Sequence, residues 1–306
     1  MTDTPTVLAC SVLQGVSYPR LVERGVFAQV NGPGEIPKLP EAARAGVRVL
    51  ITNAMLGVSA ATLDLLPGLK QVVSMGAGTD RVDFAALAAR GVPFRSVGEA
   101  LTEDVADLGM ALTLMAARRL VAADAFARDG TWLTNRFAPG RSLNGATMGI
   151  AGIGGRIGQA LARRAVAARM NVVGLHRPSA EVLGFPLFHG LRALAEASDV
   201  LMLVLPGDPA LRHAMGMEEM KALGAGGILV NIGRGELIDS AMLAKALREG
   251  VIASAGLDVV EGEPKIPAEL AALPNITFTP HIGGATAEAR LRGAAIAEDV
   301  ALAALA

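Results

Sequence analysis

Short apolar runs alternate with longer segments of helical periodicity along this 306-residue chain, and this alternation limits the possible folds more than any other feature. The runs are rich in Val, Ile and Leu at successive positions, so both faces of each run are expected to be buried. Buried strands that alternate with helices predict an α/β fold with two doubly wound parallel sheets. The predicted strands are 6–12, 47–53, 71–75, 93–97, 146–153, 171–176, 199–206, 227–232, 255–259 and 276–280.

A long gap in the strand pattern, residues 101–129, predicts the division between two domains. Its apolar residues keep helical spacing, and Thr102 followed by two acids is a plausible helix start. We therefore predict a single long helix over this gap. The alanine-rich segment 286–306 predicts another helix, and if it packs on the first sheet, the first domain is discontinuous. The expected domains are then 1–100 with 285–306, and 101–284.

The overall composition excludes several classes of protein. A net charge of −1 gives no electrostatic footprint for nucleic acid or an anionic membrane. The apolar run 200–206 is too short for a membrane-spanning helix, which needs ~20 residues, and the N-terminal segment lacks the features of a signal peptide. The single cysteine, Cys10, cannot form an intrachain disulfide and is expected to be a buried apolar residue. We expect a cytoplasmic protein without a metal site, a nucleic-acid partner or a membrane partner.

A glycine-rich turn connects predicted strand 146–153 to a helix, and this context favours a dinucleotide site. Glycines allow the backbone to approach a pyrophosphate, whose charge is met by N–H groups at the helix start. The spacing is imperfect, because the third glycine of G-x-G-x-x-G would fall at Ile157 and Gly158 follows it. A turn without a ligand is the alternative. The predicted contacts are Gly152, Gly154, Gly155, Arg156 and Ile157.

The end of the next predicted strand bears on the choice of cofactor. An NAD site usually has an acid about 20 residues after the glycines, whereas this strand ends in His176, Arg177 and Pro178. Histidine and arginine suit a 2′-phosphate through charge-assisted hydrogen bonds. We therefore predict NADPH as the cofactor, with NADH still possible. An ordinary surface pair at a strand end is the alternative explanation.

Three further segments, 231–235, 257–264 and 280–284, carry ionisable side chains directly after predicted strands. Doubly wound sheets place their sites at such strand ends. Each side chain alone has an ordinary explanation: Arg234 as an exposed loop charge, Glu263 as an acid before a turn proline, and His281 as a strand cap. Together they form a known arrangement, whose meaning depends on the other motifs of the chain.

These motifs, in this order and over essentially the whole chain, resemble the D-isomer-specific 2-hydroxyacid dehydrogenases. The resemblance is strongest to the glyoxylate/hydroxypyruvate and hydroxyphenylpyruvate reductase branch. It implies a flavodoxin-like substrate domain, a Rossmann cofactor domain and a homodimer formed through the cofactor domain. The matching segments are 74–83, 101–107, the glycine turn, 231–239, 256–264 and 280–286.

The resemblance also implies roles for individual residues in the NADPH-dependent reduction of a small 2-keto acid to a D-2-hydroxy acid. Arg234 would bind the carboxylate and keto oxygen, His281 would donate the proton, and Glu263 would hold the imidazole and favour its charged form. The implied contacts elsewhere are Leu56, Ala77 and Gly78 with the substrate, and Asp258, Pro206 and Ile232 with the cofactor.

The chain departs from the family pattern at two places, and other functions stay open. The glycine turn is one residue longer than usual, and Gly76 stands where this branch often has serine. The alternatives are an NAD-linked dehydrogenase of another, possibly aromatic, 2-hydroxy acid and a cofactor-sensing scaffold similar to corepressors. Trp132 would either reach the site of a partner subunit or serve as an amphipathic anchor after the long helix.

Overall fold

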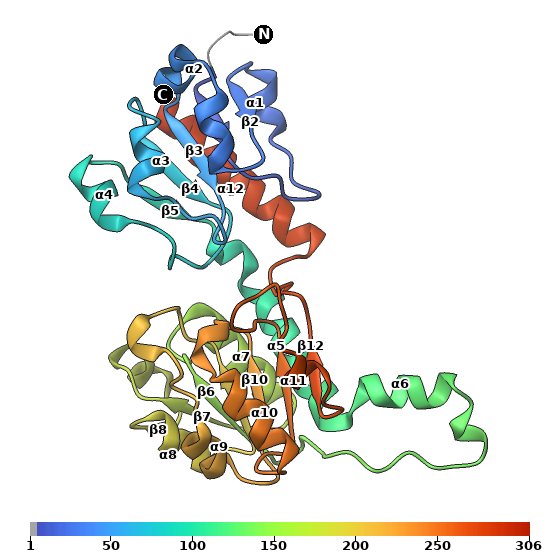
Figure 1. Cartoon of the computed structure of the whole chain (residues 1–306). Coiled ribbons are helices and arrows are strands. Elements are labelled where there is room, and N and C mark those ends of the chain that lie inside the picture. Colours follow the sequence, from blue (N-terminus) through green and yellow to red (C-terminus); the bar gives the residue numbers. More distant parts are fainter. Residues whose placement is uncertain (1–4) are drawn as a thin grey trace. The chain divides into compact units, whose positions relative to one another are not determined.

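The protein, described here by a computed structural model over residues 5–306, divides into two compact units (Figure 1). The first contains the chain up to Leu101 together with Gly284–Ala306, and the second is Thr102–Gly283. Every strand pair described in the two sheets is parallel. The prediction of two doubly wound parallel sheets is confirmed.

The first sheet has five strands in the order β2-β1-β3-β4-β5, which is the flavodoxin-like order. Sequence analysis missed β2 because its residues are only partly buried at the sheet edge and do not form a long apolar run. The strands are β1 (Val7–Ala9), β2 (Phe27–Gln29), β3 (Val49–Thr52), β4 (Gln71–Ser74) and β5 (Phe94–Ser96). The helices are α1 (Pro19–Glu23), α2 (Glu41–Gly46), α3 (Ala60–Asp64), α4 (Phe84–Ala89) and α12 (Ala287–Leu305), with 3-10 turns η1 (Pro33–Lys38) and η2 (Gly98–Leu101).

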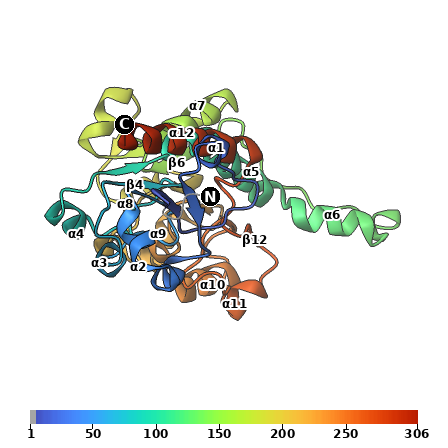
Figure 2. The same cartoon turned by 90° about the horizontal axis from the view of Figure 1, so that it is seen from above.

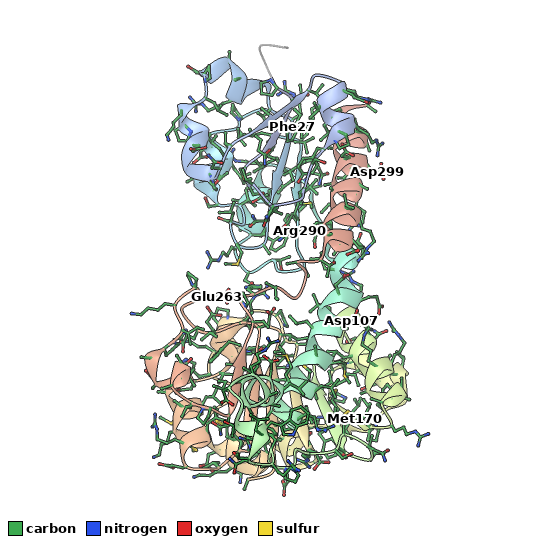
Figure 3. The ribbon with its side chains drawn as sticks, turned by 90° about the vertical axis from the view of Figure 1, so that its right-hand side faces the viewer. Phe27, Asp107, Met170, Glu263, Arg290 and Asp299 are labelled. Carbon is green, nitrogen blue, oxygen red and sulfur yellow. The ribbon has the colours of Figure 1, made fainter. Side chains whose placement is uncertain are left out.

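The C-terminal helix α12 completes the first unit, because it covers one face of this sheet. Its alanines 294, 297 and 301 pack in one core cluster with Val7 and Val49. The buried Glu298 accepts hydrogen bonds from the backbone N–H groups of Arg20 (2.8 Å) and Leu21 (3.3 Å) in the first turn of α1. The ends of the chain are thereby joined through helices α1 and α12, where Arg20 also pairs with Asp299 (Figure 3).

The second sheet has seven strands in the order β12-β11-β10-β9-β6-β7-β8, a Rossmann order with one added strand. Sequence analysis missed β8, which has only two residues. The strands are β6 (Thr147–Ala151), β7 (Asn171–Leu175), β8 (Leu187–Phe188), β9 (Val200–Leu203), β10 (Ile228–Asn231), β11 (Ser254–Leu257) and β12 (Ile276–Phe278). The direction in which strands are added reverses between β6 and β9, and ligands bind at such a point in open α/β sheets.

Helices cover this second sheet and position its loops. Helix α5 packs against α7. Arg164 on α7 pairs with Asp107 at 2.7 Å and with Glu103 at 2.6 Å on α5; Asp107 is labelled in Figure 3. The hydrogen bond from Arg164 lowers the pKa of Glu103. The helices are α5 (Thr102–Arg118), α6 (Leu120–Arg128), α7 (Arg156–Ala167), α8 (Leu191–Glu196), α9 (Met217–Leu223), α10 (Ser240–Arg248) and α11 (Ala268–Ala271), with η3 (Thr131–Leu133), η4 (Pro178–Leu183), η5 (Pro209–Leu211) and η6 (Gly235–Leu237).

The prediction of one long helix over residues 101–129 is wrong. Helix α5 ends at Arg118, Arg119 adopts a left-handed conformation with φ 52° and ψ 46°, and α6 starts in a new direction. No residue of α6 is buried, so this segment has no tertiary packing to keep it in line with α5. Together with residues 129–142 it forms an arm that extends away from the rest of its own unit in both views (Figures 1 and 2). None of the described helices has the length and apolarity of a membrane span.

Candidate active site

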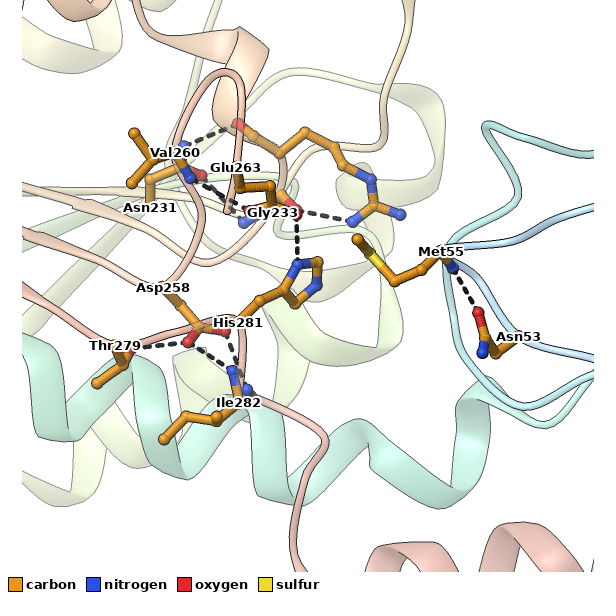
Figure 4. Close-up of polar contacts among 12 residues, drawn as sticks. Asn53, Met55, Asn231, Gly233, Asp258, Val260, Glu263, Thr279, His281 and Ile282 are labelled. Atoms are coloured by element: carbon orange, nitrogen blue, oxygen red, sulfur yellow. Dashed lines mark hydrogen bonds and ion pairs between the residues drawn. The ribbon is translucent and has the colours of Figure 1, made fainter. Parts of the chain in front are cut away.

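Three loops at the carboxyl edge of the second sheet carry the predicted catalytic side chains. Arg234 follows β10, Glu263 follows β11 and His281 follows β12. These strands are neighbours in the sheet, and parallel pairing places their carboxyl ends at the same edge (Figure 4). The sheet topology therefore brings Arg234 and Glu263, 29 positions apart in the sequence, and His281, 18 positions further along, to adjacent loops.

The loop of Arg234 is held by a buried asparagine that sequence analysis did not single out. The side-chain amide of Asn231 donates to the carbonyl of Arg234 at 2.8 Å, and its oxygen accepts from the N–H of Gly233 at 3.0 Å. The guanidinium of Arg234 in turn donates to the carbonyl of Gly233 at 2.7 Å. Asn231 thus holds the backbone of both Gly233 and Arg234, which fixes the position from which the side chain of Arg234 extends.

Gly235 allows the loops after β10 and β11 to touch through their backbones. A Cβ at this position would lie 2.2 Å from the carbonyl carbon of Val260 and 2.4 Å from the N of Glu261. Such distances are far below van der Waals contact, so only glycine fits here. The close approach brings the turn of Arg234 directly against the turn that carries Glu263.

Glu263 and His281 form a hydrogen-bonded pair with a defined orientation. Oε1 of Glu263 lies 2.7 Å from Nδ1 of His281, and Oε2 accepts from the N–H of Val260 at 3.4 Å (Figure 4). Both side chains are partly exposed, at 28% and 39%. Because the carboxylate occupies Nδ1, Nε2 is the nitrogen left to face a substrate.

The backbone of His281 lies in the left-handed region, with φ 53°, which is uncommon for a residue other than glycine. Asp258 holds it there. The buried carboxylate of Asp258 accepts from the hydroxyl of Thr279 at 2.7 Å, from the N–H of Ile282 at 2.8 Å and from the N–H of Gly283 at 2.9 Å (Figure 4). The predicted contact between Asp258 and a nicotinamide stays a prediction, whereas its anchoring of the histidine loop was not foreseen.

The glycine turn after β6 has the backbone geometry that a pyrophosphate needs. Gly152 has φ 112°, and a Cβ there would lie 2.7 Å from the carbonyl of Val204. A Cβ at Gly158 would lie 2.2 Å from the carbonyl of Gly152, so Gly158 permits α7 to pack closely on the turn. Within this turn, the N–H of Gly155 donates to the carbonyl of Gly152 at 3.0 Å, and Gly155 is the N-cap residue of α7. This cradle fits the phosphates of a dinucleotide.

The remaining predicted cofactor residues lie on loops of the same unit. Arg156 and Ile157 form the first turn of α7, and Ile232 is buried after β10, while Pro206 is exposed after β9. At the end of β7, His176 is partly buried and is followed by the exposed Arg177 and Pro178. Their contacts with a cofactor stay predictions.

The predicted substrate residues of the first unit lie on the loops after β3 and β4, which are neighbouring strands. The side-chain oxygen of Asn53 accepts from the N–H groups of Met55 and Leu56, each at 2.9 Å, and so shapes the first loop (Figure 4). In the second loop, the hydroxyl of Ser96 donates to the carbonyl of Gly76 at 2.6 Å, directly before Ala77 and Gly78. A Cβ at Gly76 would lie 2.8 Å from the Cβ of Ala54, so glycine rather than serine suits the contact between the two loops.

Comparisons with known proteins agree with this architecture. The NAD-binding domain that characterises the D-isomer specific 2-hydroxyacid dehydrogenases matches residues 110–283. The glyoxylate/hydroxypyruvate reductase A of Arabidopsis thaliana is 37% identical over 252 residues, which cover 82% of this chain and 80% of the relative. The hydroxyphenylpyruvate reductase of Plectranthus scutellarioides is 36% identical over 244 residues, which cover 80% and 78%.

A solved structure extends the likeness to both units. The NADPH-dependent glyoxylate/hydroxypyruvate reductase of Sinorhizobium meliloti, in complex with NADP and malonate, superposes with a TM-score of 0.88 at 33% identity and covers 96% of this chain and 92% of its own. Both sequence and fold therefore place the molecule in one group. The chain belongs to the D-isomer-specific 2-hydroxyacid dehydrogenase family and is an NAD(P)-dependent oxidoreductase.

Proposed function

We propose that this protein reduces a small 2-keto acid of the glyoxylate and hydroxypyruvate type to the D-2-hydroxy acid, with NADPH as the preferred reductant. The observation that carries the proposal is the pairing of Glu263 with Nδ1 of His281 at 2.7 Å, on the loop next to that of Arg234. The names of the relatives in Arabidopsis and Sinorhizobium support the substrate class.

The residues of the second unit divide the work of such a reduction. Arg234 offers a planar cation that can bind the substrate carboxylate and keto oxygen together. His281 holds a proton on Nε2, which it gives to the oxygen of the substrate as negative charge develops there. Glu263 keeps the ring in place through its contact with Nδ1, and Asp258 fixes the loop. A nicotinamide cofactor would supply the hydride when bound, and the glycine turn with His176 and Arg177 would hold its pyrophosphate and its 2′-phosphate.

A panel of keto acids tests the substrate class. Reduction is followed by absorbance of the nicotinamide with glyoxylate, hydroxypyruvate, phenylpyruvate and hydroxyphenylpyruvate, each with NADPH and with NADH. We expect the highest kcat/KM for a small acid with NADPH. A highest kcat/KM for hydroxyphenylpyruvate would favour the aromatic alternative, which the Plectranthus relative supports. Turnover of no keto acid would favour the cofactor-sensing scaffold.

The proposal includes a homodimer that covers the arm formed by residues 119–142. Large apolar side chains on the arm are exposed, among them Val121 at 56%, Trp132 at 62% and Leu133 at 89%. An edge-to-face contact between Phe126 and Phe137, with centroids 5.4 Å apart, joins the two sides of the arm. Exposed apolar side chains on an extended segment fit a second copy of the chain as partner.

The oligomeric state tests this part of the proposal. Light scattering on the intact protein should give twice the mass of the chain, and Leu133→Asp should give the mass of a monomer at micromolar concentration. Val22→Asp, at an apolar residue of α1 that is 59% exposed, is the control outside the arm and should leave the dimer intact. A monomeric mass for the unmodified protein would refute the dimer. The cytoplasmic location stays a prediction from the sequence.

A further inference from the structure

A second histidine–glutamate pair lies at the carboxyl end of β7, where the cofactor preference was predicted to be set. Nε2 of His176 lies 2.8 Å from Oε1 of Glu181, which stands on η4. Sequence analysis counted the absence of an acid at the strand end as a sign of NADPH. The structure places a carboxylate at this site from five residues further along the chain.

The short turn η4, which carries this carboxylate, packs against the glycine turn. A Cβ at Gly154 would lie 2.5 Å from the hydroxyl of Ser179, so η4 packs directly on the turn. Ala180 is fully buried, and its N–H donates to the carbonyl of Arg177 at 2.8 Å. The backbone before Glu181 is therefore fixed, while the side chain of Glu181 is 59% exposed and can move.

The ring of His176 is held from its other side by a second histidine. The backbone N–H of His176 donates to the carbonyl of Phe188 at 2.9 Å, which brings the ends of β7 and β8 together. The ring of His189, the next residue after β8, lies with its centroid 4.1 Å from that of His176 at an angle of 31°. The ring of His176 therefore lies against that of His189, while its Nε2 is directed at Glu181.

We propose that Glu181 is an internal counter-ion which occupies the place of a 2′-phosphate on His176 and so limits the preference of the enzyme for NADPH over NADH. The inference rests on the proposed function, because it concerns the same cofactor site. A phosphate oxygen and a carboxylate oxygen compete for one nitrogen, and they repel each other. NADPH must displace Glu181, whereas NADH leaves the pair intact and its ribose hydroxyl can donate to the carboxylate.

Binding of cofactor fragments tests this without any turnover. Calorimetry measures the Kd of adenosine 2′,5′-bisphosphate and of adenosine 5′-monophosphate, which differ only in the 2′-phosphate. Glu181→Gln keeps the size of the side chain and removes its charge. It should tighten the bisphosphate by about three- to tenfold, the range of an exposed charge contact, and change the monophosphate by less than about twofold. Glu218→Gln, which removes an exposed acid paired with Lys221 at 2.7 Å on α9, should change neither ligand.

A second background shows whether Glu181 acts through His176. In His176→Gln, the further change Glu181→Gln should tighten the binding of the bisphosphate clearly less than it does in the unmodified protein, because no imidazole is left for the phosphate to contact. An equal gain in both backgrounds would overturn the role of the pair. An unchanged or weakened bisphosphate in Glu181→Gln alone would overturn the inference altogether.

The same measurements separate this inference from the NADPH proposal. If the unmodified protein prefers the bisphosphate and Glu181→Gln changes nothing, the NADPH preference stands and the counter-ion is refuted. If the unmodified protein shows no preference and Glu181→Gln acquires one, the counter-ion stands and the NADPH preference is refuted. If neither protein prefers the bisphosphate, both are refuted.

Discussion

Two of the histidine–glutamate pairs at the carboxyl edge of the second sheet have nearly the same N–O distance but differ in the nitrogen used, in the loops they connect and in their exposure. His281 and Glu263 are 2.7 Å apart, and His176 and Glu181 are 2.8 Å apart. The first pair uses Nδ1 and connects two loops across neighbouring strands, whereas the second uses Nε2 within one short turn. Glu263 is 28% exposed and Glu181 is 59% exposed.

The difference teaches that the nitrogen and the loops decide what such a pair can do. A carboxylate on Nδ1 leaves Nε2 for a substrate, and the anchored loop of His281 sets the direction of that nitrogen. A carboxylate on Nε2 occupies the outer nitrogen itself and must leave before another anion can bind. We therefore expect the first pair to control chemistry and the second to control cofactor choice, and the predictions below test that division.

The largest effect is expected from loss of the proton donor. His281→Ala should lower kcat by about 10²–10⁴-fold, the usual contribution of general acid catalysis. His176→Ala, the matched change in the other pair, should lower kcat with saturating NADPH by less than about threefold. Steady-state kinetics on the best keto acid measure both. Near-normal turnover in His281→Ala would remove the histidine from the mechanism.

Reversal of the charge of Arg177, beside the second pair, should change the ratio of kcat/KM for NADPH to kcat/KM for NADH by about tenfold or more. A charge-assisted contact of Arg177 with a 2′-phosphate contributes roughly 1.5–3 kcal/mol. Arg177→Asp should therefore lower kcat/KM for NADPH strongly and leave that for NADH within about threefold. The ratio of the two efficiencies is the measurement, and equal losses with both cofactors would speak against the 2′-phosphate site.

Removal of the charge in the catalytic pair should lower the rate of reduction without weakening the binding of the cofactor. In Glu263→Gln, the carboxylate that accepts from Nδ1 of His281 at 2.7 Å is replaced by a neutral amide, so the ring loses a charge-assisted hydrogen bond that orients it. We expect kcat to fall by about tenfold, while the Kd of NADPH stays nearly the same. Glu181→Gln is the control and should leave kcat with saturating cofactor unchanged. A normal kcat in Glu263→Gln would exclude this role of the glutamate.

The smallest effect concerns the backbone contact that fixes the catalytic loops. Gly235→Ala places a Cβ 2.2 Å from the carbonyl carbon of Val260, and such overpacking costs typically 1–3 kcal/mol. We expect a lower free energy of unfolding in urea and a lower kcat. Gly34→Ala, where a Cβ would meet nothing within 4 Å, is the control and should change neither quantity. Unaltered stability of Gly235→Ala would mean that the loops can separate without cost.

The sequence predicted those features that repeat along the chain or follow a strand. The buried runs and the glycine turn needed only local pattern, whereas Arg234, Glu263 and His281 needed the resemblance to the family as well as the rule that sites lie at strand ends. The break at Arg119 carries no glycine or proline, so periodicity alone could not show it. The position of Glu181 beside His176 depends on how η4 packs against Gly154, which is a tertiary contact without a local signal.

The packing of α12 on the first sheet has a consequence for the order in which the two units fold during synthesis. A ribosome makes the 182 residues of Thr102–Gly283 between the two segments of the first unit, which takes roughly 9–36 s at about 5–20 residues per second. During that time the apolar face that includes Val7 and Val49 has no α12 to cover it, and the N–H groups of Arg20 and Leu21 have no Glu298. The second unit is continuous in sequence and can fold before α12, which the first unit needs, has been synthesised. We expect the first unit, although most of it is synthesised first, to complete its folding after the second unit.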